Sequence, residues 1–142
     1  MNFFKLWSFV GVLFLASVFV PQANAGTPSP EGAELYIISP KDGETVSKSV
    51  TIRFGLKGMG VAPAGTDKAK TGHHHLMLDG KKLPPMDQPM SKEVVKHFGG
   101  GQTEVTLSLS PGKHTLQLIL GDKAHVPHDP PVVSKSITIT VK

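Results

Sequence analysis

The residues of this chain best suited to chemistry are its histidines, because six of the seven lie in or beside three short segments. These segments are 73–75, the single histidine at position 97, and a loop that carries His125 and His128. Imidazole is the commonest metal ligand in proteins. The His-x-His and His-x-x-His spacings are typical of pairs that chelate one ion. The grouping therefore indicates a metal site assembled from several parts of the chain.

A β-strand over residues 73–79 would position the first pair, since the run ends at an Asp-Gly turn signal. Alternate residues of a strand point to opposite faces. His74 would face a core together with two leucines, which favours a hydrogen-bonded core residue over a ligand. His73, His75 and Met77 would share the other face and look outward together. Neighbours on one face are about 6.5–7 Å apart, so two imidazoles can converge on one ion with bonds of roughly 2.0 Å.

The predicted metal site combines the strand pair with the loop pair, and it requires the 121–131 loop to lie beside the outward face of strand 73–79. Its predicted ligands are His73, His75, His125 and His128, with Met77 and His97 as auxiliary ligands. Imidazole suits Cu(II) and zinc, thioether sulfur suits Cu(I), and Cu(II) binds a given nitrogen site more tightly than zinc does. Copper is therefore the predicted metal, with zinc as the runner-up.

The same histidines could instead serve the structure. Neutral imidazole donates a hydrogen bond at one nitrogen and accepts at the other, so it can clamp the backbone of a loop. His114 opens the core-facing side of its strand and is expected to be structural. His97 could be a ligand or a cation at the end of a short helical turn over 91–97, with Ser91 as its cap. The alternative function is a non-catalytic immunoglobulin-like envelope module whose histidines clamp its loops.

Residues 1–25 have the pattern of a secretory signal peptide: one positive charge at Lys5, an apolar run over 6–20 and an Ala-x-Ala sequence at its end. The run is shorter than the roughly 20 residues that span a membrane. The chain contains no cysteine, so no lipid anchor is expected at the cleavage site. We expect a periplasmic or secreted protein, with a flexible lead-in over 26–32 and a single domain over 33–142.

Composition argues against several other classes of function. The formal net charge of +4 at pH 7 is spread along the chain without a basic stripe, so no nucleic-acid partner is expected. An enzyme is not expected, because the sequence has neither a cysteine nucleophile nor a Gly-x-Ser-x-Gly elbow. Few aromatic side chains are available to stack on a glycan. The expected partner is a metal ion, with another envelope protein as a further candidate, and the protein is expected to be a monomer without membrane insertion.

Apolar and polar residues alternate in several short runs separated by Gly- and Pro-rich turns, which is typical of an all-β protein. Strands are expected at 33–38, 50–56, 73–79, 103–109, 114–120 and 132–141. The Ser-Pro-Gly turn in the middle of 103–120 favours a hairpin there, and three prolines exclude a central strand or a helix interior over 80–90. The predicted fold is an immunoglobulin-like or fibronectin-like β-sandwich of about six to seven strands with long loops.

Four unusual strings of sequence resemble a family of small exported bacterial proteins, the domain-of-unknown-function family 4399. The strings are 58–65 (Gly-Met-Gly-Val-Ala-Pro-Ala-Gly), 71–76 (Thr-Gly-His-His-His-Leu), 97–103 (His-Phe-Gly-Gly-Gly-Gln-Thr), and Leu-Gly-Asp at 120–122 followed by His-x-x-His-Asp-Pro-Pro at 125–131. The resemblance covers nearly all of the chain after the leader and is strongest over 57–142. It implies an exported all-β domain, and it brings no assigned function.

Overall fold

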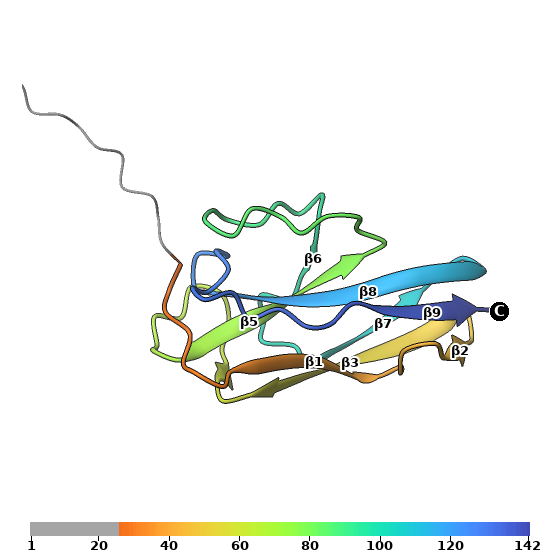
Figure 1. Ribbon diagram of the computed structural model, residues 1–142, viewed down its shortest axis with the longest axis horizontal. Coiled ribbons are helices and arrows are strands. Elements are labelled where there is room, and N and C mark those ends of the chain that lie inside the picture. The colour runs from red at the N-terminus through yellow and green to blue at the C-terminus, as the bar shows by residue number, and fades with distance from the viewer. Residues whose placement is uncertain (1–25) are drawn as a thin grey trace, which may run out of the picture.

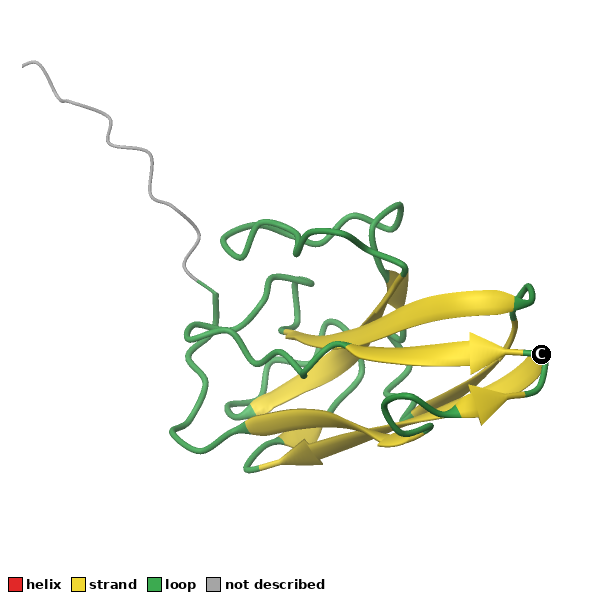
Figure 2. Ribbon diagram, turned by 45° about the vertical axis from the view of Figure 1, so that its right-hand side comes forward, coloured by secondary structure: helices red, strands yellow, loops and turns green. Residues whose placement is uncertain are grey.

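A computed structural model describes residues 26–142, so the predicted signal peptide lies outside the described residues. Two β-sheets pack face to face, and residues 26–142 contain no helix (Figures 1 and 2). None of the elements in this range could therefore cross a membrane as a helix. The strands are β1 (Glu34–Ser39), β2 (Thr45–Val46), β3 (Ser49–Lys57), β4 (Gly60–Val61), β5 (Thr71–Leu78), β6 (Lys96–His97), β7 (Glu104–Ser108), β8 (Gly112–Gly121) and β9 (Ile137–Val141). The prediction of an all-β sandwich is confirmed.

The smaller sheet has the strand order β1-β3-β7, and the larger sheet has the order β2-β9-β8-β5-β4, with β6 also pairing β5. Most pairs are antiparallel, while β2 runs parallel to β9 and β4 runs parallel to β5. The core lies between the sheets, where Ile52 and Phe54 of β3 meet Leu116 and Leu118 of β8. Burial of these apolar faces is the main force that holds the sandwich together.

The hairpin predicted over 103–120 does not form, although both of its strands exist. β7 pairs with β3 in the smaller sheet, whereas β8 pairs with β5 and β9 in the larger one. The Ser110–Gly112 turn therefore carries the chain from one sheet to the other, across the edge of the core. Two strands that face each other across a core show the same apolar alternation as two strands that lie side by side. The pattern alone does not separate these arrangements.

A third layer covers the outer face of the larger sheet. It is the cover segment, residues 79–95, which joins β5 to β6 and runs outside the sheet in Figure 1. Met90 and Val95 of the cover segment pack on Met77 of β5 and Ile119 of β8 in a second, smaller apolar cluster. The face of β5 that was predicted to look outward is therefore buried.

The cover segment has no regular structure, as its prolines predict. It ends in a single turn in which the N–H of Val95 donates to the carbonyl of Ser91 at 3.1 Å. The Ser91 hydroxyl accepts from the N–H of Glu93 at 3.2 Å, so Ser91 does cap this turn. The chain then enters β6 directly. His97 is consequently a strand residue, and the reading of His97 as a cation at a helix end is wrong.

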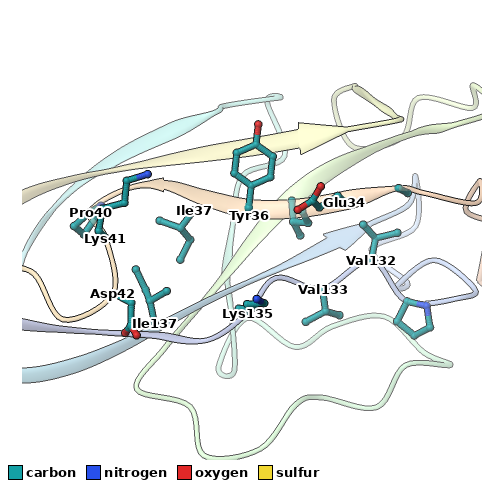
Figure 3. A pocket seen from close by; sticks show the side chains of 13 residues that line it. Glu34, Tyr36, Ile37, Pro40, Lys41, Asp42, Val132, Val133, Lys135 and Ile137 are labelled. Carbon is teal, nitrogen blue, oxygen red and sulfur yellow. The ribbon is translucent and has the colours of Figure 1, made fainter.

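A cavity of about 460 Å³ lies between β1 and the segment that precedes β9 (Figure 3). Tyr36 and Ile37 stand on one side of it, and Val132 and Val133 stand on the other. Among the described residues that line this cavity there is no histidine. The candidate chemistry of the chain therefore lies elsewhere.

Candidate metal centre

Two of the candidate ligands come from β5 and a third from β6. His73 and His75 of β5 are each only 1% exposed, because the cover segment closes over them. His97 lies directly opposite His75 in the ladder between β5 and β6. Cross-strand partners carry their side chains on the same face of the sheet, and the rings of His75 and His97 stack with centroids 5.1 Å apart.

The fourth candidate, His125, comes from the loop after β8, which is wound around Asp122. The carboxylate of Asp122 accepts hydrogen bonds from the N–H groups of Ala124 (2.8 Å) and Val126 (3.1 Å), and its carbonyl accepts from the N–H of His125 (3.0 Å). His125 has a left-handed backbone with φ of 66°, a conformation that histidine adopts more readily than most residues. The ring of His125 is thereby turned toward β5, where its Nδ1 lies 3.0 Å from Nε2 of His73.

These four histidines form one compact group. Each of His73, His75, His97 and His125 offers a nitrogen, and these nitrogens all lie within 4.8 Å of one another. In a tetrahedral site with metal–nitrogen bonds of about 2.0–2.1 Å, neighbouring ligand nitrogens are about 3.4 Å apart. Small side-chain rotations would bring all four onto one ion. His97 and His125 are half-buried, so solvent reaches the group from their side.

Several ring nitrogens of the group are buried without a hydrogen-bond partner among residues 26–142. They are Nδ1 of His73, both nitrogens of His75, and Nε2 of His97. A buried polar atom left unpaired costs about 1–3 kcal/mol, and such atoms are rare in native proteins. A bound cation would take one nitrogen from each ring and so remove most of this cost. His74 faces the opposite side of β5, where its ring packs 5.1 Å from that of Phe54 and its Nδ1 contacts the carbonyl of Gln102.

Burial and crowding lower the pKa of three imidazoles of the group, those of His73, His75 and His97. Burial, reinforced by the neighbouring histidines, lowers the pKa of His75 to about 3. Burial also lowers the pKa of His73 to about 4, again with help from His125 and His97. The pKa of His97 is lowered by burial and then by His125. Neutral imidazole is the form that binds metal, so these three rings are ready to bind at neutral pH.

The structure does not bring His128 to this group, although the sequence placed it among the ligands. Its ring is fully buried, with Nε2 lying 3.1 Å from the carbonyl oxygen of Thr71 and Nδ1 3.4 Å from that of Leu120. Gly121 forms a β-bridge with Pro127, which fixes this part of the loop along the end of β8. Both nitrogens of His128 face carbonyl groups, and because a neutral imidazole carries a single N–H, His128 clamps the loop by donating to one of them.

Met77 is also outside the group, although it shares a face with His73 and His75. Its thioether turns toward Gly80, where a Cβ atom would lie 2.4 Å from the Met77 sulfur. The methionine that borders the group is Met90 of the cover segment, whose N–H donates to the carbonyl of His125 at 3.0 Å. Sequence reasoning missed Met90, because it lies in a stretch without a periodic pattern.

Two glycines make room for the rings. A Cβ atom on Gly121 would lie 2.5 Å from Cε1 of His75, and one on Gly99 would lie 2.4 Å from Cε1 of His97. Real Cβ atoms do not approach so closely, so any larger residue at either position would displace a ring. These glycines belong to the predicted strings 120–122 and 97–103, but nothing in the sequence indicates that they face histidines.

The start of the described chain supports the loop that carries His125. The hydroxyl of Thr27 donates to the Asp122 carboxylate at 2.8 Å, and Ser29 and Asp129 are joined by a backbone hydrogen bond of 3.0 Å. Burial raises the pKa of Asp122, but hydrogen bonds from Thr27 and from the loop amides outweigh it, so the pKa lies below its ordinary value. The lead-in predicted to be flexible is thus tied down over residues 27–29.

Comparison with curated proteins and with solved structures gave no match. A family model matches residues 52–142, a range that holds all four histidines of the group but neither β1 nor Thr27. This confirms the resemblance drawn from the four strings of sequence. The chain belongs to the family described as Domain of unknown function (DUF4399).

Proposed function

We propose that this protein is an exported metal-binding module that handles copper in the periplasm, with His73, His75, His97 and His125 as its ligands. The observation that carries the proposal is the convergence of four imidazoles, from β5, β6 and the loop after β8, within 4.8 Å. Three chain segments far apart in the sequence meet at this point, which is how a protein fixes the geometry of a metal site. The role is binding and transfer of the ion rather than catalysis.

A metal explains the group better than a structural role does. Histidines that clamp loops use their ring nitrogens on backbone groups, as His128 does with Thr71 and Leu120. In the four-histidine group, by contrast, the one hydrogen bond of a ring nitrogen between described residues joins two of its own members, His73 and His125. Both nitrogens of His75 stay buried and unpaired within residues 26–142. A clamp would leave that cost without compensation.

Copper is favoured over zinc by the chemistry of the donor set. Four imidazoles supply nitrogen ligands only, and Cu(II) stands above zinc in affinity for a given nitrogen site. A binding site in the periplasm meets metal ions outside the cytosolic buffers, so the intrinsic order of affinity matters there. Export itself rests on the signal-peptide pattern of residues 1–25. Fractionation of an expressing cell, with N-terminal sequencing of the periplasmic protein, tests it: a chain that keeps residues 1–25 contradicts export.

The decisive experiment is a metal-competition titration of the purified protein, with Cu(I), Cu(II) and Zn(II) each measured against a chelator of known affinity. We expect one equivalent of copper to bind tightly. In the His125→Asn variant, affinity should fall by at least about tenfold, the lower limit for loss of a supporting group at a metal site. Asparagine is suited to this position because it tolerates the left-handed backbone of His125.

The matched control is His114→Gln, which removes an imidazole outside the group. His114 is held by the Asp79 carboxylate and the Ser110 carbonyl, each at 2.8 Å, so this variant should bind copper as the wild type does. Weak binding of several equivalents, equally affected by both substitutions, would contradict the proposal. Stoichiometric binding of zinc alone would support a metal site at these histidines and would identify zinc, rather than copper, as its metal.

One observation favours the second candidate function, an immunoglobulin-like envelope module held together by its histidines. His128 links the loop after β8 to the end of β5, and a Cβ atom on Gly72 would lie 2.7 Å from its ring. On this view the whole histidine set orders loops for a protein partner. The same titration separates the two functions, since a structural clamp gives no stoichiometric metal binding.

A further inference from the structure

Met90 of the cover segment borders the histidine group, and both its backbone and its side chain are held there. Its N–H donates to the carbonyl of His125 at 3.0 Å, which fixes its backbone beside one ligand. Its side chain is 7% exposed and belongs to the smaller apolar cluster with Met77, Val95 and Ile119. Met90 is therefore held in place at both its backbone and its side chain.

The side chain of Met90 extends toward a second ligand, His75. The Met90 methyl carbon and Nδ1 of His75 each lie 3.0 Å from the position that a Cβ atom on Gly121 would take. These two atoms are thus no more than about 6 Å apart. Both nitrogens of His75 are buried without partners in the described chain. An unused nitrogen and a thioether consequently border the same small space above Gly121.

Methionine is the side chain best able to adjust to such a space. It is unbranched and has three rotatable bonds, so its sulfur can move toward a ligand without displacing the backbone. The thioether is a soft ligand that favours Cu(I), and it adds little to the binding of zinc. Met77 cannot play this part in the observed arrangement, because its sulfur is turned to Gly80 at the end of β5.

We propose that Met90 is a further metal ligand, which binds through its sulfur in place of one of the four imidazoles when the site holds Cu(I). This inference rests on the proposed function, and it deepens that function by assigning the reduced ion to the site. The sheet and the loop after β8 supply nitrogen ligands for either oxidation state, while the cover segment supplies the sulfur. The cover segment then contributes to the choice between Cu(I) and zinc, in addition to excluding water.

The test compares Met90→Leu with Met77→Leu, two substitutions of similar shape in the same apolar cluster. We expect Met90→Leu to lower Cu(I) affinity by about tenfold, comparable to loss of a supporting group, with Zn(II) affinity unchanged. Met77→Leu should leave both affinities as in the wild type. X-ray absorption of the Cu(I) protein should show a sulfur atom bound to copper in the wild type and in Met77→Leu, and only nitrogen in Met90→Leu.

Three results would overturn the assignment of Met90 and leave the four-histidine site itself unaffected. One is a wild-type Cu(I) spectrum without sulfur, and the other is an equal loss of Cu(I) affinity in both leucine variants. Equal loss of zinc and Cu(I) in Met90→Leu would show a packing role and would also overturn it. If the proposed metal site itself is wrong, the wild type will bind neither copper nor zinc stoichiometrically. That result is distinct from the three that concern Met90 alone.

Discussion

At the scale of single residues, the four-histidine group depends on two glycines as much as on the histidines themselves. Gly121 and Gly99 leave open the space that the rings of His75 and His97 occupy. The group can be compact because two strands bring histidines together and two glycines let the rings turn inward. A larger residue at either glycine would therefore disturb the histidines as directly as a change of the histidine itself.

This gives a first prediction. In Gly121→Ala the added methyl group would lie within 2.5–3.0 Å of atoms of His75 and Met90, so the His75 ring must move. We expect copper affinity to fall about 10–100-fold, as when the orientation of a ligand is disturbed. The overpacking should also cost about 1–3 kcal/mol in the free energy of unfolding. Competition titration and urea unfolding measure the two effects.

Gly60→Ala is the matched control for this substitution. Gly60 lies in β4, and a Cβ atom there would meet Thr71 at 3.5 Å, an ordinary van der Waals distance. Copper affinity should be unchanged in this variant. If Gly60→Ala weakened binding as much as Gly121→Ala does, the argument from close approach to His75 would fail.

At the scale of elements, the sequence predicts the strands well and their partners poorly. Alternation of apolar residues identifies the strands over 50–56 and 73–79, because it reports which side of a strand is buried. It does not report which strand lies alongside, so the β7–β8 crossing between sheets was read as a hairpin. The faces of β5 were assigned correctly, but the cover segment that buries His73 and His75 has no periodic signal.

The candidate site, like the fold, could be predicted from the sequence only in part. His73, His75 and His125 could be grouped from sequence, because short spacings and one assumed loop position suffice. His128 could not be separated from them, since its clamp depends on the carbonyl groups of Thr71 and Leu120. Met90 could not be found at all, because its place follows from tertiary packing on Ile119 and from one backbone hydrogen bond.

The support of the His125 loop by the start of the chain gives a second prediction. Thr27→Val removes the hydroxyl that donates to the Asp122 carboxylate at 2.8 Å and keeps the shape of the side chain. We expect a loss of about 1 kcal/mol in stability, typical of one hydrogen bond. Copper affinity should also fall, because the loop that presents His125 is wound on Asp122.

Ser29→Ala is the control within the same segment. The Ser29 hydroxyl donates to the carbonyl of Pro130 at 2.7 Å and has no contact with Asp122. Its removal should leave copper affinity unchanged. Titration of both variants beside the wild type decides the matter, and an equal effect of the two substitutions would show that Asp122 has no special part.

At the scale of the whole molecule, two sets of histidines oppose each other in their effect on stability as the pH changes. His73 and His75 have pKa values lowered to about 4 and about 3, chiefly by burial. Their neutral forms are favoured by folding, so this stability is present above pH 6.5 and is lost as the pH falls through those values. His114 has its pKa raised by hydrogen bonds to Asp79 and Ser110. Its contribution is complete below pH 6.5 and is lost as the pH rises through the raised pKa.

The third prediction follows for the metal-free protein. The free energy of unfolding, measured in urea across the pH range, should pass through a maximum near neutral pH and fall on both sides. His114→Gln should remove part of the fall on the alkaline side and leave the acid side as it is. Added copper should raise stability most where the four imidazoles are neutral, because protons compete with the ion. If the free energy of unfolding fell equally at alkaline pH in the wild type and in His114→Gln, the attribution of that fall to His114 would be contradicted.

The crossing of the chain between sheets at Ser110–Gly112 also governs the speed of folding. Because β7 and β8 do not pair with each other, most ladders join residues that are distant in the chain, such as Ser49 with Ser108, His73 with Gly121 and Thr45 with Thr140. Chains dominated by such long-range pairs close large loops before they gain contacts, and they fold in milliseconds to seconds rather than microseconds. The four histidines come together only when β5 has paired with β6 and with β8, because His125 follows β8. A newly made chain thus has an interval in which it holds no assembled four-histidine group.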